Sequence, residues 1–188
     1  MVTAYKRCLN PVLSILICHL PEREVSYLAL LDQLGIQTSG NVEVLVDDTP
    51  RGVLTIGEKR NNLLASSTGR YVAYIDDDDL IAGNYVRLIL NAAREDNDCI
   101  GMTGILRRKD KPDWQFRHSI TVGRWCKDRN RHIYFRTPNH LNPIKADIAK
   151  SVGFVPISHG EDRDYSDRIR PLLKTETFIE QAIYIYQK

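Results

Sequence analysis

The sequence predicts an α/β fold in which helices cover both faces of a mostly parallel central sheet. Three short apolar segments, 12–18, 42–46 and 71–75, have the length and composition of buried strands, and a segment with helical periodicity follows each of them. Parallel neighbours need a long crossover, usually a helix, so this alternation favours parallel pairing. A chain of 188 residues can bury one substantial core, and we expect residues 1–188 to form a single domain.

The N-terminal half predicts three strands that alternate with three helices. The expected order is strand 12–18, helix 22–34, strand 42–46, helix 58–67, strand 71–75 and a helix that follows Gly83 and runs to about residue 95. We expect Gly35 to end the first helix, because glycine readily adopts the left-handed conformation found at helix ends. Two of the strands run directly into carboxylates, which places acidic groups at the edge of the sheet where such folds bind ligands.

The C-terminal half predicts a less regular set of elements. The expected order is strand 99–106, a basic hairpin face at 107–117, strand 133–136, helix 145–152, an acidic segment 161–167 and strand 182–186. The loop 138–143 either walls a binding site or serves as scaffold. Trp125 either packs in the core or stacks on a sugar ring.

Charge, hydropathy and cysteine usage exclude several classes of protein. The formal net charge is only +2, which gives no general attraction to nucleic acid or to an anionic membrane. The most apolar stretch, residues 12–20, is about half of the roughly 20 residues that span a bilayer, so we expect no transmembrane segment. The four cysteines, Cys8, Cys18, Cys99 and Cys126, contain no CxxC pair, and no signal peptide is evident. Reduced thiols and a cytoplasmic location are therefore expected.

Four consecutive aspartates, Asp76 to Asp79, follow the third strand directly. Like charges repel, so a divalent cation is one reason for the run: Mg²⁺ and Mn²⁺ prefer carboxylate oxygens and bridge them to phosphates. The other reason is an acidic turn that caps the next helix. The apolar strand before the run, together with the second acidic strand end, favours the cation.

A basic segment, Gly-Glu-Lys-Arg-Asn-Asn at 57–62, opens the second helix. Cations near a helix N-terminus oppose the helix dipole, so Lys59 and Arg60 indicate an anionic ligand that free N–H groups would also bind. A solvated helix face, with Glu58 pairing nearby, is the alternative.

An ordered series of segments resembles the family 2 glycosyltransferases of the GT-A fold. The series comprises strand 14–18, Val-Glu-Val-Leu-Val-Asp-Asp at 42–48, Gly-Glu-Lys-Arg-Asn at 57–61, Gly-Arg-Tyr-Val-Ala-Tyr-Ile-Asp-Asp-Asp-Asp at 69–79 and Gly-Glu-Asp-Arg-Asp-Tyr at 160–165. The resemblance implies transfer of a sugar from a nucleotide diphosphate donor, with a UDP-sugar favoured, to a saccharide or glycan acceptor, with inversion and with Mn²⁺ or Mg²⁺. It also implies a nucleotide-sugar-binding half at about 12–105 and an acceptor-binding half at about 106–188.

The resemblance implies roles for residues near the nucleotide. Asp48, with Asp47 beside it, matches the aspartate that binds the nucleotide base. Lys59, Arg60 and Asn61 match the segment that lines the nucleotide pocket.

Two acidic motifs complete the resemblance. Asp76 and Asp78 match the DxD motif, whose first carboxylate faces ribose or metal and whose later one ligates the metal; Asp77 lies within the motif, and Asp79 matches the extra aspartate that often follows it. Glu161 and Asp162 match the ED motif, in which the aspartate is the usual general base. From the residues alone, the second cluster could equally start a helix whose dipole favours acids.

The chain departs from the family pattern at two places. His19, Leu20, Pro21 and Glu22 stand where a Pro-Thr-Tyr-Asn type of turn is usual. Tyr184 and Tyr186 stand in the closing strand, where relatives carry a histidine or basic residue near the diphosphate.

Two other functions stay open at the level of the sequence. A sugar-phosphate nucleotidyltransferase could use a related scaffold, but the first strand is not followed by the glycine-rich phosphate loop that such enzymes carry. A non-catalytic calcium- or carbohydrate-binding module would explain the carboxylates without turnover, although the run 76–79 lacks the glycine of an EF-hand loop.

Overall fold

The structure is a computed structural model that describes residues 1–7, 9–38 and 40–188, so Cys8 lies outside the described residues. The strands are β1 (Val2–Lys6), β2 (Leu13–Cys18), β3 (Val42–Asp47), β4 (Tyr71–Tyr74), β5 (Leu80–Ile81), β6 (Cys99–Arg108), β7 (Lys111–His118), β8 (Cys126–Asp128), β9 (Ile133–Arg136), β10 (Ile144–Lys145) and β11 (Glu176–Gln187). The α-helices are α1 (Glu24–Gln37), α2 (Ile56–Ser66), α3 (Tyr85–Ala92), α4 (Ala146–Val152) and α5 (Glu161–Ile169).

One sheet holds all the described strands, in the order β1-β3-β2-β4-β10-β6-β7-β9-β8, with β11 paired to β6 and β5. The central strands β3, β2 and β4 are parallel, as the alternation of strands and helices predicts. In the second half, a tight turn joins β6 to β7 as an antiparallel hairpin, because antiparallel neighbours need no helical crossover. β10 pairs antiparallel with both β4 and β6 and joins the two halves. The α/β fold is confirmed, with a sheet that is parallel at its N-terminal centre and mixed as a whole.

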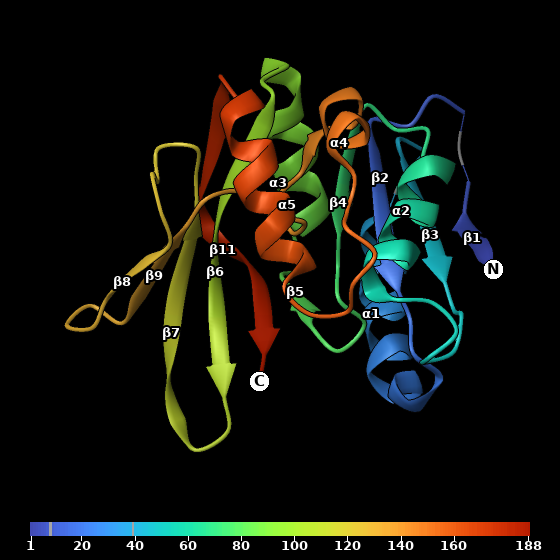
Figure 1. Ribbon diagram of the computed structural model, residues 1–188, viewed down its shortest axis with the longest axis horizontal. Coiled ribbons are helices and arrows are strands. Elements are labelled where there is room, and N and C mark those ends of the chain that lie inside the picture. Colours follow the sequence, from blue (N-terminus) through green and yellow to red (C-terminus); the bar gives the residue numbers. More distant parts are fainter. Residues whose placement is uncertain (8, 39) are drawn as a thin grey trace.

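Helices cover both faces of this sheet, as predicted, and Figure 1 shows α2, α4 and α5 grouped in front of it. α1 and α3 pack on the opposite face, where Leu30 and Ile89 join one core cluster. α2 contributes Leu63 to the second cluster, on the face that it shares with α4 and α5. β2 supplies both clusters, Ile15 to the first and Leu16 to the second, because successive side chains of a strand point to opposite faces.

The prediction that Gly35 ends the first helix is wrong. α1 continues to Gln37, whose side-chain amide donates to the carbonyl oxygen of Ala82 at 3.0 Å and accepts from the N–H of Val86 at 3.1 Å. These contacts tie the last turn of α1 to the start of α3, so the tertiary structure extends the helix past the glycine.

The basic segment forms the predicted hairpin. β6 and β7 meet at a turn in which Asp110 has a positive φ of 58°, and the tip of the hairpin is largely exposed. No helix among the described residues has the length and hydropathy needed to cross a bilayer. Cys18, Cys99 and Cys126 carry free thiols.

Candidate active site

Two adjoining clefts lie at the carboxyl edge of the central strands. The first cleft, of about 530 Å³, is bounded by the ends of β2 and β4, the loop 50–56 and the first turn of α2. The second cleft, of about 380 Å³, lies between β9, the loop 139–141 and the start of α5. The residues that line both clefts are Arg60, Asp76, Ser158, His159, Glu161 and Tyr186.

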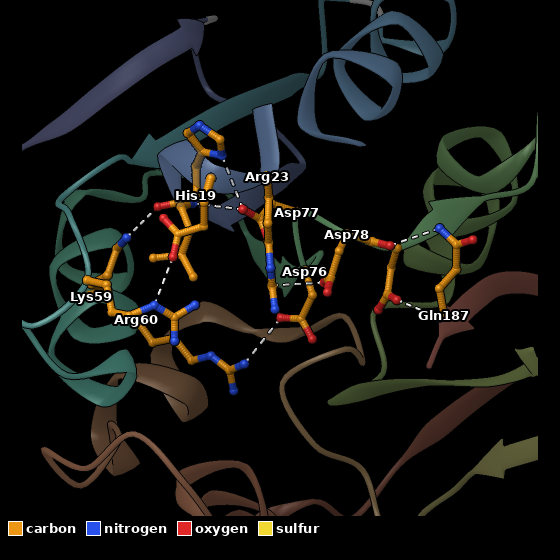
Figure 2. Close-up of polar contacts among 12 residues, drawn as sticks. His19, Arg23, Lys59, Arg60, Asp76, Asp77, Asp78 and Gln187 are labelled. Carbon is orange, nitrogen blue, oxygen red and sulfur yellow. Dashed lines mark hydrogen bonds and ion pairs between the residues drawn. The ribbon is translucent and has the colours of Figure 1, made fainter. Parts of the chain in front are cut away.

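Asp77 is almost fully buried, and the protein itself uses its carboxylate. The N–H of Leu20 donates to Oδ2 at 2.8 Å, Arg23 Nη1 donates to Oδ1 at 2.9 Å, and His19 Nδ1 lies 3.1 Å from Oδ2 (Figure 2). These bonds tie the chain after β2 to the chain after β4. In the segment that departs from the family pattern, His19 and Leu20 contact Asp77, and Leu20 lines the first cleft.

Asp79 is also buried and bonded within the protein. Its Oδ2 accepts from the Tyr184 hydroxyl at 2.7 Å, and its Oδ1 accepts from the N–H of Gln187 at 2.7 Å. Burial, with Asp76 nearby, raises the pKa of Asp79 to about 8. Asp79 does not line either cleft, and both of its carboxylate oxygens accept hydrogen bonds from β11; a role as a metal ligand stays a prediction.

Asp76 and Asp78 are the members of the run whose carboxylates remain for a ligand. Asp76 lines both clefts, and Asp78 lines the first. Burial opposes ionisation of Asp76, but His140, Arg60 and Arg23 together hold its pKa well below the usual value. Burial raises the pKa of Asp78, against the attraction of Arg23, whose Nη1 lies 3.1 Å from its Oδ1.

These two carboxylates suit a hard divalent cation. Mg²⁺ is usually held by one or two carboxylates and completes its coordination with phosphate oxygens and water. No cluster of three or more His, Cys, Asp or Glu side chains converges among the described residues, so a cage made entirely of protein ligands is not present there. The donor set therefore fits a cation that a diphosphate helps to hold.

Arg60 connects the two acidic motifs. Its buried guanidinium lies 3.3 Å from Asp76 Oδ1 and 3.2 Å from Glu161 Oε1, and it rests over the rings of Tyr74 and Phe154. Burial alone would lower the pKa of Arg60, but Asp76 and Glu161 raise it above its ordinary value. The single charge of Arg60 is shared between the partly exposed Asp76 and the buried Glu161, and its contacts fix the wall that the clefts share.

The start of α2 is satisfied by the protein itself. The N–H of Gly57 donates to the carbonyl oxygen of Ile157 at 3.1 Å, and Thr55 and Glu58 form a reciprocal capping box. Lys59 is buried, and its Nζ donates to the carbonyl oxygens of His19 at 2.6 Å and Thr49 at 2.8 Å. An anion is therefore not needed to explain these cations: Lys59 holds together the chain segments after β2 and β3.

Three further predicted residues lie outside the lining of both clefts. Asn61 bridges α2 to the chain after α4 through bonds of 2.8 Å to the carbonyl oxygen and N–H of Phe154. Asp47 is buried and accepts from the N–H of Thr49, whereas the neighbouring Asp48 is exposed at the rim. A role for Asp48 in binding the nucleotide base stays a prediction.

The second acidic motif opens α5. Gly160 has a positive φ of 84°, a conformation that glycine adopts without strain, and it sets Glu161 and Asp162 in the first helical turn. Glu161 is buried against Arg60, whereas Asp162 is partly exposed and lines the second cleft. The predicted helix start is confirmed, and the role of Asp162 as general base stays a prediction.

Several cleft residues were missed by the sequence analysis. Arg23 reaches the first cleft from the chain after β2, and Arg136 reaches the second from the end of β9, whereas the loop 138–143, which the sequence analysis did name, lines the second cleft through Asn139, His140 and Leu141. His140 Nε2 lies 3.5 Å from Asp76 Oδ2. No local pattern marks Arg23 or Arg136, because only the tertiary structure brings them to the clefts.

A model of the family described as glycosyl transferase family 2 matches residues 28–152, more than half of the chain. The chain belongs to glycosyl transferase family 2. This assignment favours the first of the three functions that the sequence left open. A comparison with curated protein sequences gave no match.

Crystal structures of TarS from S. aureus share the fold of this family 2 glycosyltransferase. TarS 1–349 has a TM-score of 0.67 and 15% sequence identity over 93% of this chain and 60% of that chain. Its complex with UDP-GlcNAc has a TM-score of 0.67 and 15% identity over 94% of this chain and 58% of that chain. The chain thus spans about 60% of the length of TarS 1–349, and at this identity the likeness shows the GT-A fold alone.

Proposed function

We propose that this family 2 glycosyltransferase moves a sugar from a UDP-sugar to a saccharide or glycan acceptor, with inversion and with help from Mn²⁺ or Mg²⁺. The observation that carries the proposal is the pair of adjoining clefts: Asp78 lines the first alone and Asp162 the second alone. A sugar at their junction has the diphosphate on one side and the acceptor hydroxyl on the other. An inverting displacement needs this arrangement.

On the donor side, Asp76 and Asp78 would hold the metal together with the diphosphate. A bound divalent cation supplies Lewis-acid stabilisation of the charge that develops on the leaving diphosphate. Arg23 and Arg60 keep these carboxylates from repelling one another in the free enzyme. A uridine nucleotide is the favoured donor because a TarS crystal structure contains UDP-GlcNAc.

On the acceptor side, Asp162 is positioned to act as general base. It takes the proton of the acceptor hydroxyl as the new bond to the anomeric carbon forms and the bond to the diphosphate breaks. Positioned bases of this kind contribute about 10²- to 10⁴-fold to the rate. Glu161 supports Asp162 by fixing the start of α5 through Arg60.

Thermal unfolding of the protein with UDP, UDP-GlcNAc and other nucleotide sugars, each with and without Mn²⁺, tests the donor. A ligand present at about 100 times its Kd stabilises the fold by about 2.7 kcal/mol, so UDP with Mn²⁺ should raise the Tm clearly. Asp78→Asn should lose the part of this rise that depends on Mn²⁺. If no nucleotide diphosphate shifts the Tm under any condition, the proposed donor site is refuted.

Turnover of the donor tests the base. Asp162→Asn should lower the rate of transfer by about 10²-fold or more while the stabilisation by UDP stays unchanged. The neighbouring, partly exposed Asp164 is a matched control, since its carboxylate pairs with Arg168. Full activity of Asp162→Asn would show that Asp162 is not the general base.

A further inference from the structure

Arg136 is a cation of the second cleft that forms no ion pair with any described acidic side chain. The neighbouring arginines are paired: Arg60 with Asp76 and Glu161, Arg163 with Asp167, and Arg168 with Asp164. Arg136 ends β9 and is partly buried, yet no described carboxylate forms an ion pair or hydrogen bond with its guanidinium; Asp162 acts on it only from a greater distance. Burial lowers the pKa of Arg136, as expected for a desolvated cation that lacks compensation.

Two aromatic rings hold this guanidinium in place. The guanidinium carbon lies 4.6 Å from the centre of the Trp125 ring and 5.7 Å from that of Tyr134. Trp125 is itself fixed, because its Nε1–H donates to Thr137 Oγ1 at 2.8 Å, and Thr137 in turn bonds Ser166 of α5. The cleft wall therefore presents an oriented guanidinium beside flat apolar surface. Such a surface can pack against a sugar ring while the guanidinium binds an oxyanion.

The carboxylates of the second cleft leave the guanidinium of Arg136 without a direct ion pair. Asp76 and Glu161 share the guanidinium of Arg60, and Asp162 is the other acidic side chain that lines the cleft. Asp162 lies at the start of α5 and Arg136 at the end of β9. The second cleft is therefore lined by a negative side chain from one element and a positive side chain from the other. An occupant with a hydroxyl near Asp162 and an oxyanion at Arg136 satisfies both.

We infer that the acceptor bound in the second cleft is an anionic saccharide, with a phosphate or carboxylate held by Arg136 and a ring packed against Trp125 and Tyr134. This inference rests on the proposed function, because it names the class of acceptor for the same site. The forked donors of arginine bind phosphate and carboxylate in pairs, which explains why a guanidinium stands at this position.

Calorimetric titration of the protein saturated with UDP and Mn²⁺ tests the inference, because UDP then blocks the first cleft to other anions. The probes are glucose, glucose 6-phosphate and glucuronate. Wild-type protein should bind at least one of the anionic sugars about tenfold or more tightly than glucose, since hydrogen bonds between charged groups are the stronger kind. The two anionic sugars distinguish phosphate from carboxylate. Equal binding of all three sugars by the wild type overturns the inference without any variant.

Two variants locate the effect. Arg136→Gln should bind the anionic sugars no more tightly than glucose, whereas Arg163→Gln, which removes a paired and exposed cation beside the same Trp125 ring, should keep the preference. If both variants lose the preference equally, general charge and not Arg136 selects the anion. Arg136→Lys keeps the charge and should retain part of the preference.

The binding of UDP separates this inference from the proposed function. Arg136→Gln should bind UDP with Mn²⁺ as the wild type does, because Arg136 does not line the first cleft. If UDP does not bind the wild type, the proposed donor is refuted. The preference for anionic sugars that depends on Arg136 is then measured by titration without UDP.

Discussion

Asp77 and Asp78 are neighbours in sequence with opposite surroundings. Asp77 has 1% of its side chain exposed and receives three polar contacts from the chain after β2, whereas Asp78 has 38% exposed and shares only Arg23. Repulsion among the four aspartates is thus relieved largely by the protein. The fold therefore does not depend on a cation at this run, and the proposed cation belongs to the function.

A pair of matched substitutions follows from this difference. Asp77→Ala leaves the N–H of Leu20 and the ring of His19 without their acceptor and should lower the free energy of unfolding by about 2 to 4 kcal/mol. Asp78→Ala should change it by less than about 1 kcal/mol and abolish the Mn²⁺-dependent binding of UDP. Urea denaturation and nucleotide titration separate the two effects; equal destabilisation would contradict the division of roles.

Arg60 provides the second prediction at this scale. Arg60→Met removes the cation between two carboxylates and should lower the free energy of unfolding by about 3 to 5 kcal/mol, because breaking a buried ion pair leaves charge unpaired. Adding Glu161→Gln to this variant removes one of those charges and should restore part of the loss. Chemical denaturation of the two variants measures this recovery, and its absence would show that Arg60 acts through packing alone.

The sequence motifs predicted some of the residues that line the clefts. The structure separates these residues from motif residues whose side chains bond within the protein. The DxD spacing selected Asp76 and Asp78, which do line the clefts, but it could not tell that Asp79 faces Tyr184. The partner lies 105 positions away in sequence. Lys59 lines the first cleft, but the sequence could not show that its Nζ donates to two backbone carbonyls, so a contact with an anion stays a prediction.

At the scale of the element, α2 is fixed by a close contact with the chain after α4. A Cβ on Gly57 would lie 1.9 Å from the carbonyl oxygen of Val155, so only glycine lets α2 come this close to the loop after α4. The contact also holds Ser158 and His159 at the rim of both clefts.

Gly57→Ala should therefore lower the free energy of unfolding by about 1 to 3 kcal/mol and weaken the binding of UDP, because the backbone has to shift. Gly83→Ala is the control, since nothing lies within 4 Å of the added Cβ and its φ is not in the left-handed region. Thermal unfolding with and without UDP compares them. Equal behaviour of the two variants would exclude a special role for the contact.

The regular elements were largely predictable and the short ones were not. Strands 42–46 and 71–75 are short apolar segments with one helix, 58–67, between them, and the three fall within one or two residues of β3, β4 and α2. β5 and β10 have two residues each, too few to show any period. β7 carries the sequence Lys-Pro-Asp-Trp-Gln-Phe-Arg-His; its charges indicated a hairpin face, but only the pairing with β6 sets the bounds of the strand.

At the scale of the whole molecule, His118 links stability to pH. Burial, and Arg136 secondarily, lower its pKa to about 3, so the folded protein keeps the imidazole neutral. The unfolded chain binds a proton near pH 6.5, and the folded one does not until about pH 3. The contribution of His118 to stability is thus present above pH 6.5 and lost as the pH falls through this window.

Wild-type protein should lose up to about 2 kcal/mol of its free energy of unfolding between pH 7 and pH 5 through this residue. His118→Gln, which retains a donor for Asn142 Oδ1, should show a correspondingly smaller loss across the same range. Urea denaturation at both pH values measures the difference. Identical pH dependence of the two proteins would assign the effect to other groups.

β10 makes the sheet continuous between the two halves of the molecule. Ile144 pairs with Val72 on one side and with Cys99 on the other, and among the described strands this short segment carries the sheet from β4 to β6. Loss of β10 from the sheet would break hydrogen bonds with β4 and with β6 at the same time. Backbone amides of β4 and β6 should then exchange with deuterium at one common, slow rate. The two-residue strand would thus make the two halves of the sheet unfold together.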